Sequence, residues 1–468
     1  MGEEKQTTGL AEHPVLSSSD GVQDILHKVI IAHQQALKLL QETENAYSRL
    51  VPHQLLKLLE VKSIVDVKLG DQVERKMAIM FSDIRDFTPL SESMTPAENF
   101  EFINSYLSQM EPVIGKHRGI IDKFIGDAIL ALFEHDADDA VSGAIAMLER
   151  LNYYNAGRIR AGYTPIQVGI GINTGMVMIG TVGGLNRMDS TVIGDAVNLT
   201  ARLQEATKTY HAPLIISQNV YYDLSNPGQY HIRLLDRIRV KGKSQPLSIY
   251  EVFDNDPAEL RSSKVACQPL FDEAIAFYHL KDIPRAIELL KQCVELAPND
   301  IPALMYLERC YEFQATGQHW STGELDIGLL WKDEYFTGNA QIDEAHQQLL
   351  AKTNQFTAEI KLDRIRFDDI FSFLNDYTQN LFPIEDRLMQ EFNYPFTESH
   401  QQEHRRFIRH YQELEKRVQE GIDAPRYLAF RIALLLLDWF SSHAIKMDRH
   451  MTRHVQNISN PRKRSPEQ

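Results

Sequence analysis

The sequence is short of cysteine and of positive charge. Its 468 residues include three cysteines, Cys267, Cys293 and Cys310, too few and too scattered for a disulfide framework or a zinc knuckle. They indicate reduced thiols in a cytoplasmic protein. Lysine and arginine total 49 against 64 acidic residues, and the net charge of −15 argues against nonspecific binding to nucleic acid or to an anionic membrane.

Long apolar runs are also missing. The most apolar stretch, Ala433 to Phe440, contains Asp438 and falls well short of the roughly 20 residues that a spanning helix needs. The N-terminus begins Met-Gly-Glu-Glu-Lys and lacks the apolar core of a secretory signal. We therefore expect a soluble protein with no membrane insertion.

Length and patterning predict a multidomain protein. At about 150 residues per domain the chain has room for roughly three domains. Hydrophobic residues make up 43% and charged residues 24%, an ordinary globular balance that excludes a mainly disordered chain. Changes in pattern divide the chain into a flexible lead-in (1–20), an N-terminal helix (21–66), an alternating strand and helix region (67–255), a helical connector (256–323), a four-helix region (324–456) and a polar tail (457–468).

The N-terminal helix has apolar residues at alternating spacings of four and three. Leu26, Ile30, Leu37 and Leu40 follow this pattern, and Pro52 marks a break. Two interpretations stay open, a short parallel coiled coil between two copies and one amphipathic helix that docks on its own domain. The connector resembles a tetratricopeptide unit, but about one and a half repeats do not make a stable peptide-binding array.

The alternating region predicts a mixed sheet. Expected strands are Met77–Phe81, Gly119–Ile125, Ala128–Phe133, Gln167–Asn173 and Met176–Thr181, and expected helices are Pro96–Gly115, Asp138–Tyr154 and one after Gly194. Gly126 and Asp127 form the two-residue turn of a tight hairpin. We expect an α+β fold related to the ferredoxin-like plan, with the helices on one face of the sheet.

Two aspartates in this region suggest a metal site. Asp83 directly follows an apolar strand, and Asp127 occupies the hairpin turn. If those strands are neighbours, the two carboxylates converge at the strand ends. Hard oxygen ligands of this kind suit Mg²⁺ or Mn²⁺ together with phosphate oxygens.

Four sequence blocks around these aspartates resemble the class III nucleotidyl cyclases. The blocks are Phe81-Ser-Asp-Ile-Arg-Asp-Phe-Thr88, Lys123-Phe-Ile-Gly-Asp127, Val168-Gly-Ile-Gly-Ile-Asn-Thr-Gly175 and Thr191-Val-Ile-Gly-Asp-Ala-Val-Asn-Leu-Thr-Ala-Arg202. They occur in the family's order across residues 67 to 253. The resemblance implies a ferredoxin-like catalytic domain that cyclises a nucleoside triphosphate.

The resemblance also implies roles for individual residues. Asp83 and Asp127 would hold two Mg²⁺ or Mn²⁺ ions, and backbone amides at Ile84, Phe87 and Thr88 would cradle the phosphates. Asn198 would orient the ribose, Arg202 would stabilise charge on the α-phosphate, and Lys241 is a weaker candidate for the triphosphate. One departure is Asp86, which stands where the family commonly has glycine; aspartate tolerates a positive φ, so we expect the loop to form.

Two residues bear on the choice of base. Lys123 only donates hydrogen bonds, which suits the acceptor N1 of adenine and opposes the N1–H of guanine. Guanylate cyclases carry a glutamate at this position. Thr191 can accept from the adenine amino group, and threonine here resembles the subgroup associated with bicarbonate stimulation. The family's active site lies between two catalytic domains, so one complete residue set predicts a symmetric homodimer with two shared sites.

A second cluster of metal-ligating residues occupies the C-terminal quarter. Seven of the 17 histidines fall between His346 and His454. His400 and His404 are four residues apart, so they share a helix face and can bind one metal. By contrast His410, His450 and His454 look like surface residues. A four-helix bundle with inward carboxylates and histidines is the general plan of a di-iron site.

Residues 330 to 455 resemble the hemerythrins. The blocks are Ile342-Asp-Glu-Ala-His346, Phe382-Pro-Ile-Glu385, His400-Gln-Gln-Glu-His404 and Trp439…His443…Asp448. The resemblance implies non-haem di-iron: His400, His404 and His443 on one iron, His346 on the other, and Glu385 and Asp448 as bridges. The family expects a histidine before Phe382, where this chain has Leu381, so the second iron would keep one imidazole and reversible O₂ binding does not follow.

The leading hypothesis is an adenylate cyclase that converts ATP to 3′,5′-cyclic AMP and pyrophosphate and is regulated by a C-terminal sensor of O₂, redox state or iron. An alternative is an O₂- or iron-binding protein whose cyclase domain serves only for dimerisation. The complete cyclase set favours the first, because the hemerythrin-like set lacks a ligand at Leu381. A guanylate cyclase is disfavoured by Lys123.

Overall fold

A computed structural model describes residues 20–47, 53–61, 63–134, 136–184, 187–238, 246–317, 330–421 and 423–459. The predicted lead-in and most of the polar tail lie outside these residues. The chain divides into two units, Met1–Val67 and Lys68–Gln468. The first unit contains the helices α1 (Asp20–Tyr47) and α2 (His53–Leu58). The apolar residues of α1 are exposed, including Leu26 at 57% and Leu40 at 65%.

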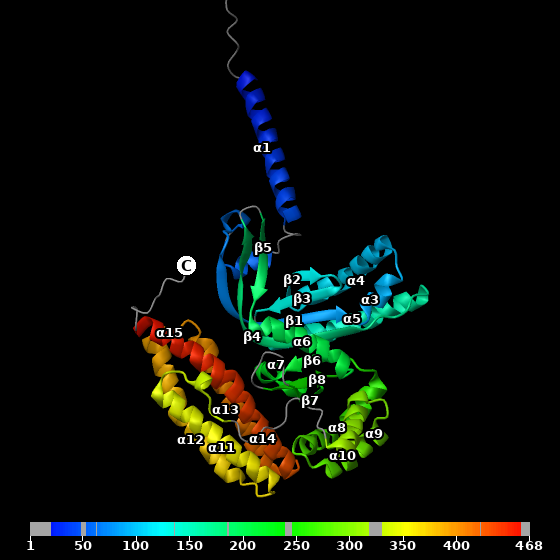
Figure 1. Cartoon of the computed structure of the whole chain (residues 1–468). Helices are drawn as coiled ribbons and strands as arrows, with labels where there is room; N and C mark the ends of the chain where they lie inside the picture. Colours follow the sequence, from blue (N-terminus) through cyan, green and yellow to red (C-terminus); the bar gives the residue numbers. More distant parts are fainter. Residues whose placement is uncertain are drawn as a thin grey trace, which may run out of the picture. The chain divides into compact units, whose positions relative to one another are not determined.

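The first part of the second unit, the α/β region, is built on an eight-stranded sheet (Figure 1). The strands are β1 (Gln72–Ile84), β2 (Ile120–Ile125), β3 (Ala128–Phe133), β4 (Val168–Gly184), β5 (Arg187–Ile193), β6 (Leu214–Ser217), β7 (Ile232–Ile238) and β8 (Leu247–Val252). Their order is β2-β3-β1-β4-β6-β8-β7, and β5 pairs with β4. The predicted break between two strands near Thr174 is wrong, because β4 runs through it and pairs with β1 from Val168 to Gly180.

The helices of this region are α3 (Phe87–Glu92), α4 (Pro96–Lys116), α5 (Ala137–Arg160), α6 (Asp195–Thr209) and α7 (Gln218–Asp223). The expectation that helices cover one face is wrong. Ile170 and Ile172 of β4 pack in one core with α4 and α5, whereas α6 packs in another core on the opposite face. Gly171 makes this possible, because a Cβ there would stand 2.4 Å from the backbone nitrogen of Gln204 in α6. The alternation of isoleucine and glycine along β4 therefore admits a helix at close range.

Three helices form the connector, α8 (Ala258–His279), α9 (Ile283–Leu296) and α10 (Ile301–Thr316). Ion pairs fix them to the edge of the sheet. The guanidinium of Arg233 in β7 donates to Glu251 of β8 at 2.7 Å and to both oxygens of Asp300, at 2.6 and 2.7 Å, just before α10. Lys264 of α8 donates to Glu251 at 2.7 Å, and all four side chains are buried. Such a network leaves no charge uncompensated and so holds the connector in one position.

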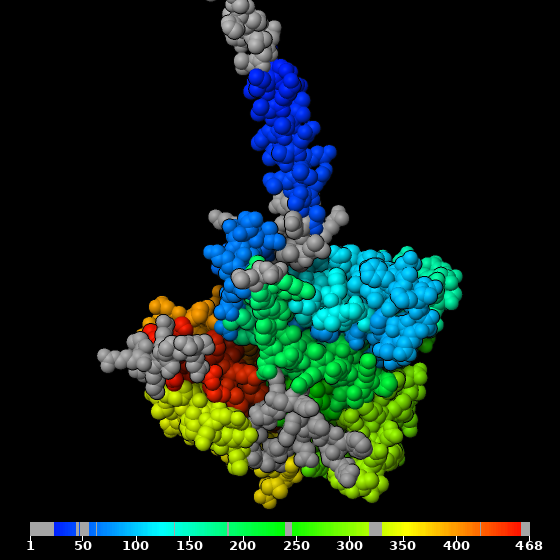
Figure 2. Space-filling view, turned by 45° about the horizontal axis from the view of Figure 1, so that its top comes forward, coloured from blue at the N-terminus to red at the C-terminus, as the bar shows by residue number. Residues whose placement is uncertain are grey.

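The last part is a helical bundle. It consists of α11 (Ala340–Lys361), α12 (Phe367–Glu391), α13 (Thr397–Glu420) and α14 (Pro425–Trp439), and α14 continues through a π-helical segment (Phe440–Asp448) into α15 (Arg449–Ser459). These helices lie side by side in Figure 1, and Figure 2 shows the bundle, coloured yellow to red, against the green part of the α/β region. The run Pro425–Ser459 has the length and mean hydropathy of a membrane-spanning helix, but 78% of its most apolar window is buried. Such burial is typical of a helix in a bundle core.

Candidate active site and metal centre

The carboxylates of Asp83 and Asp127 meet at one end of the sheet. Strand β1 pairs with β3, so the end of β1 lies beside the β2–β3 turn. Asp127 is 9% exposed, and its Oδ2 accepts a hydrogen bond from the amide of Ile84 at 3.2 Å. Burial, and then the neighbouring Asp83 carboxylate, raise the pKa of Asp127 to about 7. Two facing carboxylates of this kind fit a divalent cation, whose positive charge would offset the repulsion between them.

The chain turns sharply shortly after Asp83. Asp86 has φ 54° and ψ 35°, so the departure from glycine is accommodated in the left-handed region. It is followed by the short helix α3, which begins at Phe87 and includes the exposed Thr88. The ring of Phe87 stacks on Phe102 of α4 with centroids 6.3 Å apart. The candidate phosphate-binding backbone is therefore anchored to the core by Phe87 and by the buried Ile84.

Lys123 and Thr191 contact each other, although β2 and β5 are not paired in the sheet. The ammonium of Lys123 donates to Thr191 Oγ1 at 3.1 Å and to the carbonyl of Ser190 at 3.3 Å. Asp122, which the sequence analysis did not single out, lies 3.4 Å from the ammonium, and its side chain is fully buried. Burial raises the pKa of Asp122, and the nearby Lys123 opposes that rise. Asp122 lies where the pairing register between β2 and β3 shifts. The alternation of inward and outward residues along a strand does not predict such a shift, so the burial of Asp122 was not expected from the sequence.

The remaining candidate residues of the α/β region lie on or beyond α6. Asn198 is exposed and Arg202 half-buried, one helical turn apart on α6. The helix is held near its start by Asn173 of β4, whose amide donates to the carbonyl of Ala196 at 3.1 Å. Lys241 lies outside the described residues.

All six predicted iron ligands converge inside the bundle. Glu385 of α12 lies with His400, His404 and His443, and a second group joins His346, Glu385 and Asp448, with ligand atoms within 4.8 Å of one another in each group. His404 Nε2 lies 2.8 Å from Glu385 Oε2. Asp448 lies 2.9 Å from His346 Nε2 and 3.2 Å from both His400 and His443 Nε2. Every one of these side chains is buried.

The ligand atoms of this centre are better placed to bind a cation than to form hydrogen bonds with one another. Both oxygens of Glu385, one oxygen of Asp448 and both ring nitrogens of His400 are buried without hydrogen-bond geometry to a partner. Burial alone would lower the pKa of His400, but the facing carboxylates of Asp448 and Glu385 raise it to about 9. Orphaned buried polar atoms are rare unless an ion or water satisfies them. The centre therefore fits a metal.

Two family models match the chain. Residues 70–252 match the adenylate and guanylate cyclase catalytic domain, and residues 337–455 match the hemerythrin HHE cation binding domain. The chain thus joins a cyclase catalytic domain to a hemerythrin domain.

Individual proteins are similar to the cyclase part of the chain. An adenylate cyclase of Anabaena cylindrica is 40% identical over 233 residues, 48% of this chain and 46% of that protein. The terminal-differentiation-specific adenylate cyclase of Dictyostelium discoideum is 36% identical over 305 residues, 64% of this chain and 14% of that protein. An adenylyl cyclase crystal structure from P. aeruginosa has 36% identity, covers 39% of this chain and 96% of its own, and has a TM-score of 0.37. The chain spans less than half the length of these two curated relatives.

Leu381 occupies the position at which the resemblance to the hemerythrins predicts a further histidine ligand. Leu381 lies one turn before Glu385 on α12, is 2% exposed and belongs to the apolar core of the domain. His410 is buried, so its prediction as a surface residue is wrong: its ring packs against Tyr222 of the cyclase domain. His450 and His454 are half-buried beside Tyr394.

The π-helical segment lies at the metal centre itself. It begins at Phe440, contains His443 and ends at Asp448. Residues five apart on an α-helix point about 140° away from each other. In a π-helix hydrogen bonds run between residues five apart, so His443 and Asp448 are brought to the same side. Short π-helical segments occur frequently at functional sites.

Proposed function

We propose that this protein is an adenylate cyclase that converts ATP to 3′,5′-cyclic AMP and pyrophosphate. The observation that carries the proposal is the contact of Lys123 with Thr191, which presents one donor and one hydroxyl as a pair. Such a pair complements N1 and the amino group of adenine and opposes the N1–H of guanine. The names of the relatives from Anabaena cylindrica and Dictyostelium discoideum support the same substrate.

In this proposal Asp83 and Asp127 hold two Mg²⁺ or Mn²⁺ ions. Such ions lower the pKa of the ribose 3′-hydroxyl and neutralise the pyrophosphate. The amides of Ile84, Phe87 and Thr88 bind phosphate oxygens, as amides at a turn and helix start can do. On α6, Asn198 orients the ribose and Arg202 stabilises the charge that develops on the α-phosphate. Lys241 remains a candidate for the triphosphate.

We further propose that the active unit is a homodimer with two shared sites. One protomer would supply Asp83 and Asp127, and its partner would supply the base-binding and α6 residues. The exposed apolar stripe on α1 supports pairing by a coiled coil, because such a stripe gains stability by packing on a second copy. The mostly buried helix Pro425–Ser459 supports a cytoplasmic location without membrane insertion.

The hemerythrin domain is proposed to regulate this activity. His346, Glu385, His400, His404, His443 and Asp448 would hold non-haem iron, with Leu381 leaving one position to water or weaker binding. Iron bound there supplies redox and dioxygen-binding chemistry. The alternative, in which the cyclase domain serves only for dimerisation of an iron- or O₂-binding protein, is opposed by the complete set of cyclase residues.

One experiment tests the proposal. The purified chain is incubated with ATP or GTP and Mg²⁺ or Mn²⁺, with and without O₂, and cyclic nucleotides and bound metals are measured. We expect cyclic AMP from ATP and little cyclic GMP. Failure to cyclise ATP with either metal would support the dimerisation alternative, and a preference for GTP would refute the role given to Lys123.

A further inference from the structure

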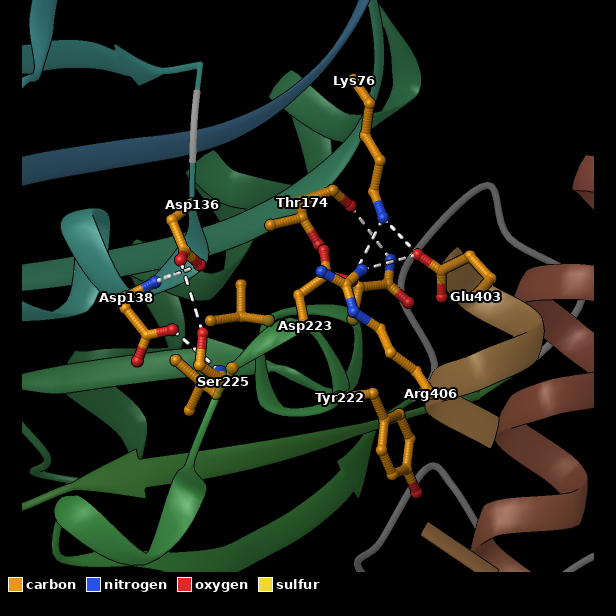
Figure 3. Close-up of polar contacts among 12 residues, drawn as sticks. Lys76, Asp136, Asp138, Thr174, Tyr222, Asp223, Ser225, Glu403 and Arg406 are labelled. Atoms are coloured by element: carbon orange, nitrogen blue, oxygen red, sulfur yellow. Dashed lines mark hydrogen bonds and ion pairs between the residues drawn. The ribbon is translucent and has the colours of Figure 1, made fainter. Parts of the chain in front are cut away.

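Four charged side chains join the hemerythrin domain to the cyclase domain. Lys76 of β1 and Asp223 of α7 face Glu403 and Arg406 of α13 (Figure 3). Lys76 lies 3.1 Å from Asp223 and forms a short contact with Glu403, while Arg406 pairs with Asp223 and lies 3.0 Å from Glu403. The side chain of Asp223 is 7% exposed and that of Glu403 17%. Partial burial makes these pairs stronger than exposed ion pairs.

On the bundle side, the four-charge cluster begins beside the metal centre. Glu403 directly precedes the ligand His404 on α13. A change in the position of His404 on this rigid helix therefore also moves Glu403 and Arg406. Both bundle residues of the cluster thus lie within two positions of the candidate ligand His404.

On the cyclase side, hydrogen bonds continue from α7 to the helix that carries Asn198 and Arg202. The amide of Asn219, on the same short helix as Asp223, donates to the carbonyl of Thr174 at 3.1 Å and to Asn173 Oδ1 at 3.5 Å. Asn173 in turn donates to the carbonyl of Ala196 in the first turn of α6. Asn198 lies two residues further on. Polar contacts at its two ends and the short helix α7 between them thus connect α13 with α6.

A cavity of about 290 Å³ runs alongside these contacts. One wall contains His443, Glu403 and Trp439 of the hemerythrin domain, and the other contains Asp195 and Leu199 of α6. Close packing transmits small displacements, whereas a cavity absorbs them. The polar contacts through α7 therefore offer a direct connection between the metal centre and α6 beside this cavity.

Building on the proposed function, we propose that helix α7 relays the state of the metal centre to α6, through Arg406 and Asp223 at one end and Asn219 and Asn173 at the other. Asp223, Asn219 and Arg406 are positioning residues, because none of them belongs to either candidate site. Coupling of this kind is reciprocal. If metal binding changes the affinity for nucleotide by some factor, nucleotide binding changes the affinity for metal by the same factor.

The test uses the full chain, metal-free or loaded anaerobically with Fe²⁺. Backbone hydrogen exchange is measured in peptides of α6 and α7, and Fe²⁺ affinity is measured by chelator competition with and without a non-cyclisable ATP analogue. The variants are Arg406→Gln, which breaks the pair with Asp223 and leaves the pair of Lys76 with Glu403, and Asn219→Ala, which leaves the ion pairs intact and breaks the next step. Arg417→Gln is the matched control, because Arg417 is also on α13 but pairs with Asp423 within the hemerythrin domain.

In wild type and Arg417→Gln, we expect Fe²⁺ to change exchange in α6 and α7, and the ATP analogue to shift Fe²⁺ affinity about fivefold or more. In Arg406→Gln and Asn219→Ala, both effects should disappear while the bundle still binds Fe²⁺. If both variants keep the wild-type response, or if wild type shows no response in α6, the relay is refuted. The exchange measurement needs no nucleotide, so a chain that fails to bind ATP would refute the proposed function and still test the relay.

Discussion

The ammonium of Lys123 and the hydroxyl of Thr191 lie 3.1 Å apart, although 68 positions separate them in the sequence. Neither residue needs the other to fold its own strand, since β2 pairs with β3 and β5 pairs with β4. Their contact therefore joins two strands that are not neighbours in the sheet. Behind it the buried carboxylate of Asp122 holds the ammonium in place.

Replacing Lys123 should change the preferred base. In Lys123→Glu the carboxylate accepts from guanine N1–H and opposes adenine N1, so kcat/KM for ATP should fall about 10- to 100-fold while the GTP-to-ATP ratio rises. Cyclic AMP and cyclic GMP formation measured side by side would show this. Lys123→Met is the control, since it removes the donor without adding an acceptor and should lower activity with ATP without a gain for GTP.

Removing either aspartate should abolish catalysis. In Asp83→Asn or Asp127→Asn, Mg²⁺- or Mn²⁺-dependent cyclic AMP formation should fall by ~100-fold or more, because each ion loses a charged ligand. Circular dichroism should remain that of wild type. Mixing Asp83→Ala with Arg202→Ala protein should restore part of the activity, because a mixed dimer contains one intact shared site. Heterodimers that form but stay inactive would argue against sites shared between protomers.

Leu381→His should fill the missing ligand position. We expect iron content to rise towards two per chain and affinity at the His346 end to increase by ~10-fold or more, because an imidazole joins a small ligand set. Metal analysis and the absorption of an oxo-bridged iron pair are the measurements. Leu381→Met keeps the volume without adding an imidazole and should leave iron content unchanged. Two tightly held irons in wild type, unaffected by Leu381→His, would contradict the idea of a weakened site.

His410 should make the domain interface sensitive to acid. Burial, together with Arg409, Arg431 and Arg406 nearby, lowers its pKa to about 4, although the carbonyl of Tyr222 acts in the opposite direction. Its ordinary pKa is 6.5, so the unfolded chain takes up the proton first as pH falls. Stability is therefore fully present above pH 6.5 and declines between pH 6.5 and 4, by up to about 3 kcal/mol.

Thermal unfolding of wild type and His410→Gln between pH 7.5 and 5 would measure this effect. The two proteins share every other titrating group, so the difference between their melting temperatures reports on His410. We expect His410→Gln to lose less stability as pH falls. Parallel curves would show that the protonated imidazole is accommodated at the interface.

Two glycine replacements should have opposite effects on stability, because only one of the glycines lies at the close contact between α6 and β4. Gly171→Ala places a Cβ 2.4 Å from the backbone nitrogen of Gln204 and should cost about 1–3 kcal/mol of unfolding free energy. Gly115→Ala lies within α4 with nothing inside 4 Å and should add about 0.5–1 kcal/mol. Denaturant unfolding followed by circular dichroism would test both. Equal changes would show that α6 can shift away from β4 without cost.

Local sequence signals predicted several features correctly. The Gly126-Asp127 turn between two apolar runs specified the β2–β3 hairpin, because turn chemistry and strand pattern agree there. The break predicted near Thr174 is wrong, because β4 continues through Gly175, which pairs with Met77 of β1. That glycine instead lets β4 pass Ala196, whose Cβ would lie 2.9 Å from a Cβ at Gly175. Local composition does not distinguish a turn from a close approach.

Features that depend on distant contacts were not predictable from local patterns. The burial of His410 depends on Tyr222, almost 190 positions earlier, so no helical period reveals it. The six residues of α7 are too short for a periodic signal, and their partners lie on β1, β4 and α13. The bridging role of Asp448 came from the family resemblance, since a spacing of five from His443 does not predict a shared α-helical face.

The π-helical segment Phe440–Asp448 contains one residue more than an α-helix would have in its place. Deleting one residue there, such as Ala444 or Ile445, would restore ordinary α-helical hydrogen bonding and give the last helix a better backbone. It would leave His443 and Asp448 four residues apart on an α-helix, where the two side chains still share a face. The spacing of five and the π-helical hydrogen bonding therefore have to match: a substitution that restored α-helical hydrogen bonding without removing a residue would point Asp448 about 140° away from His443.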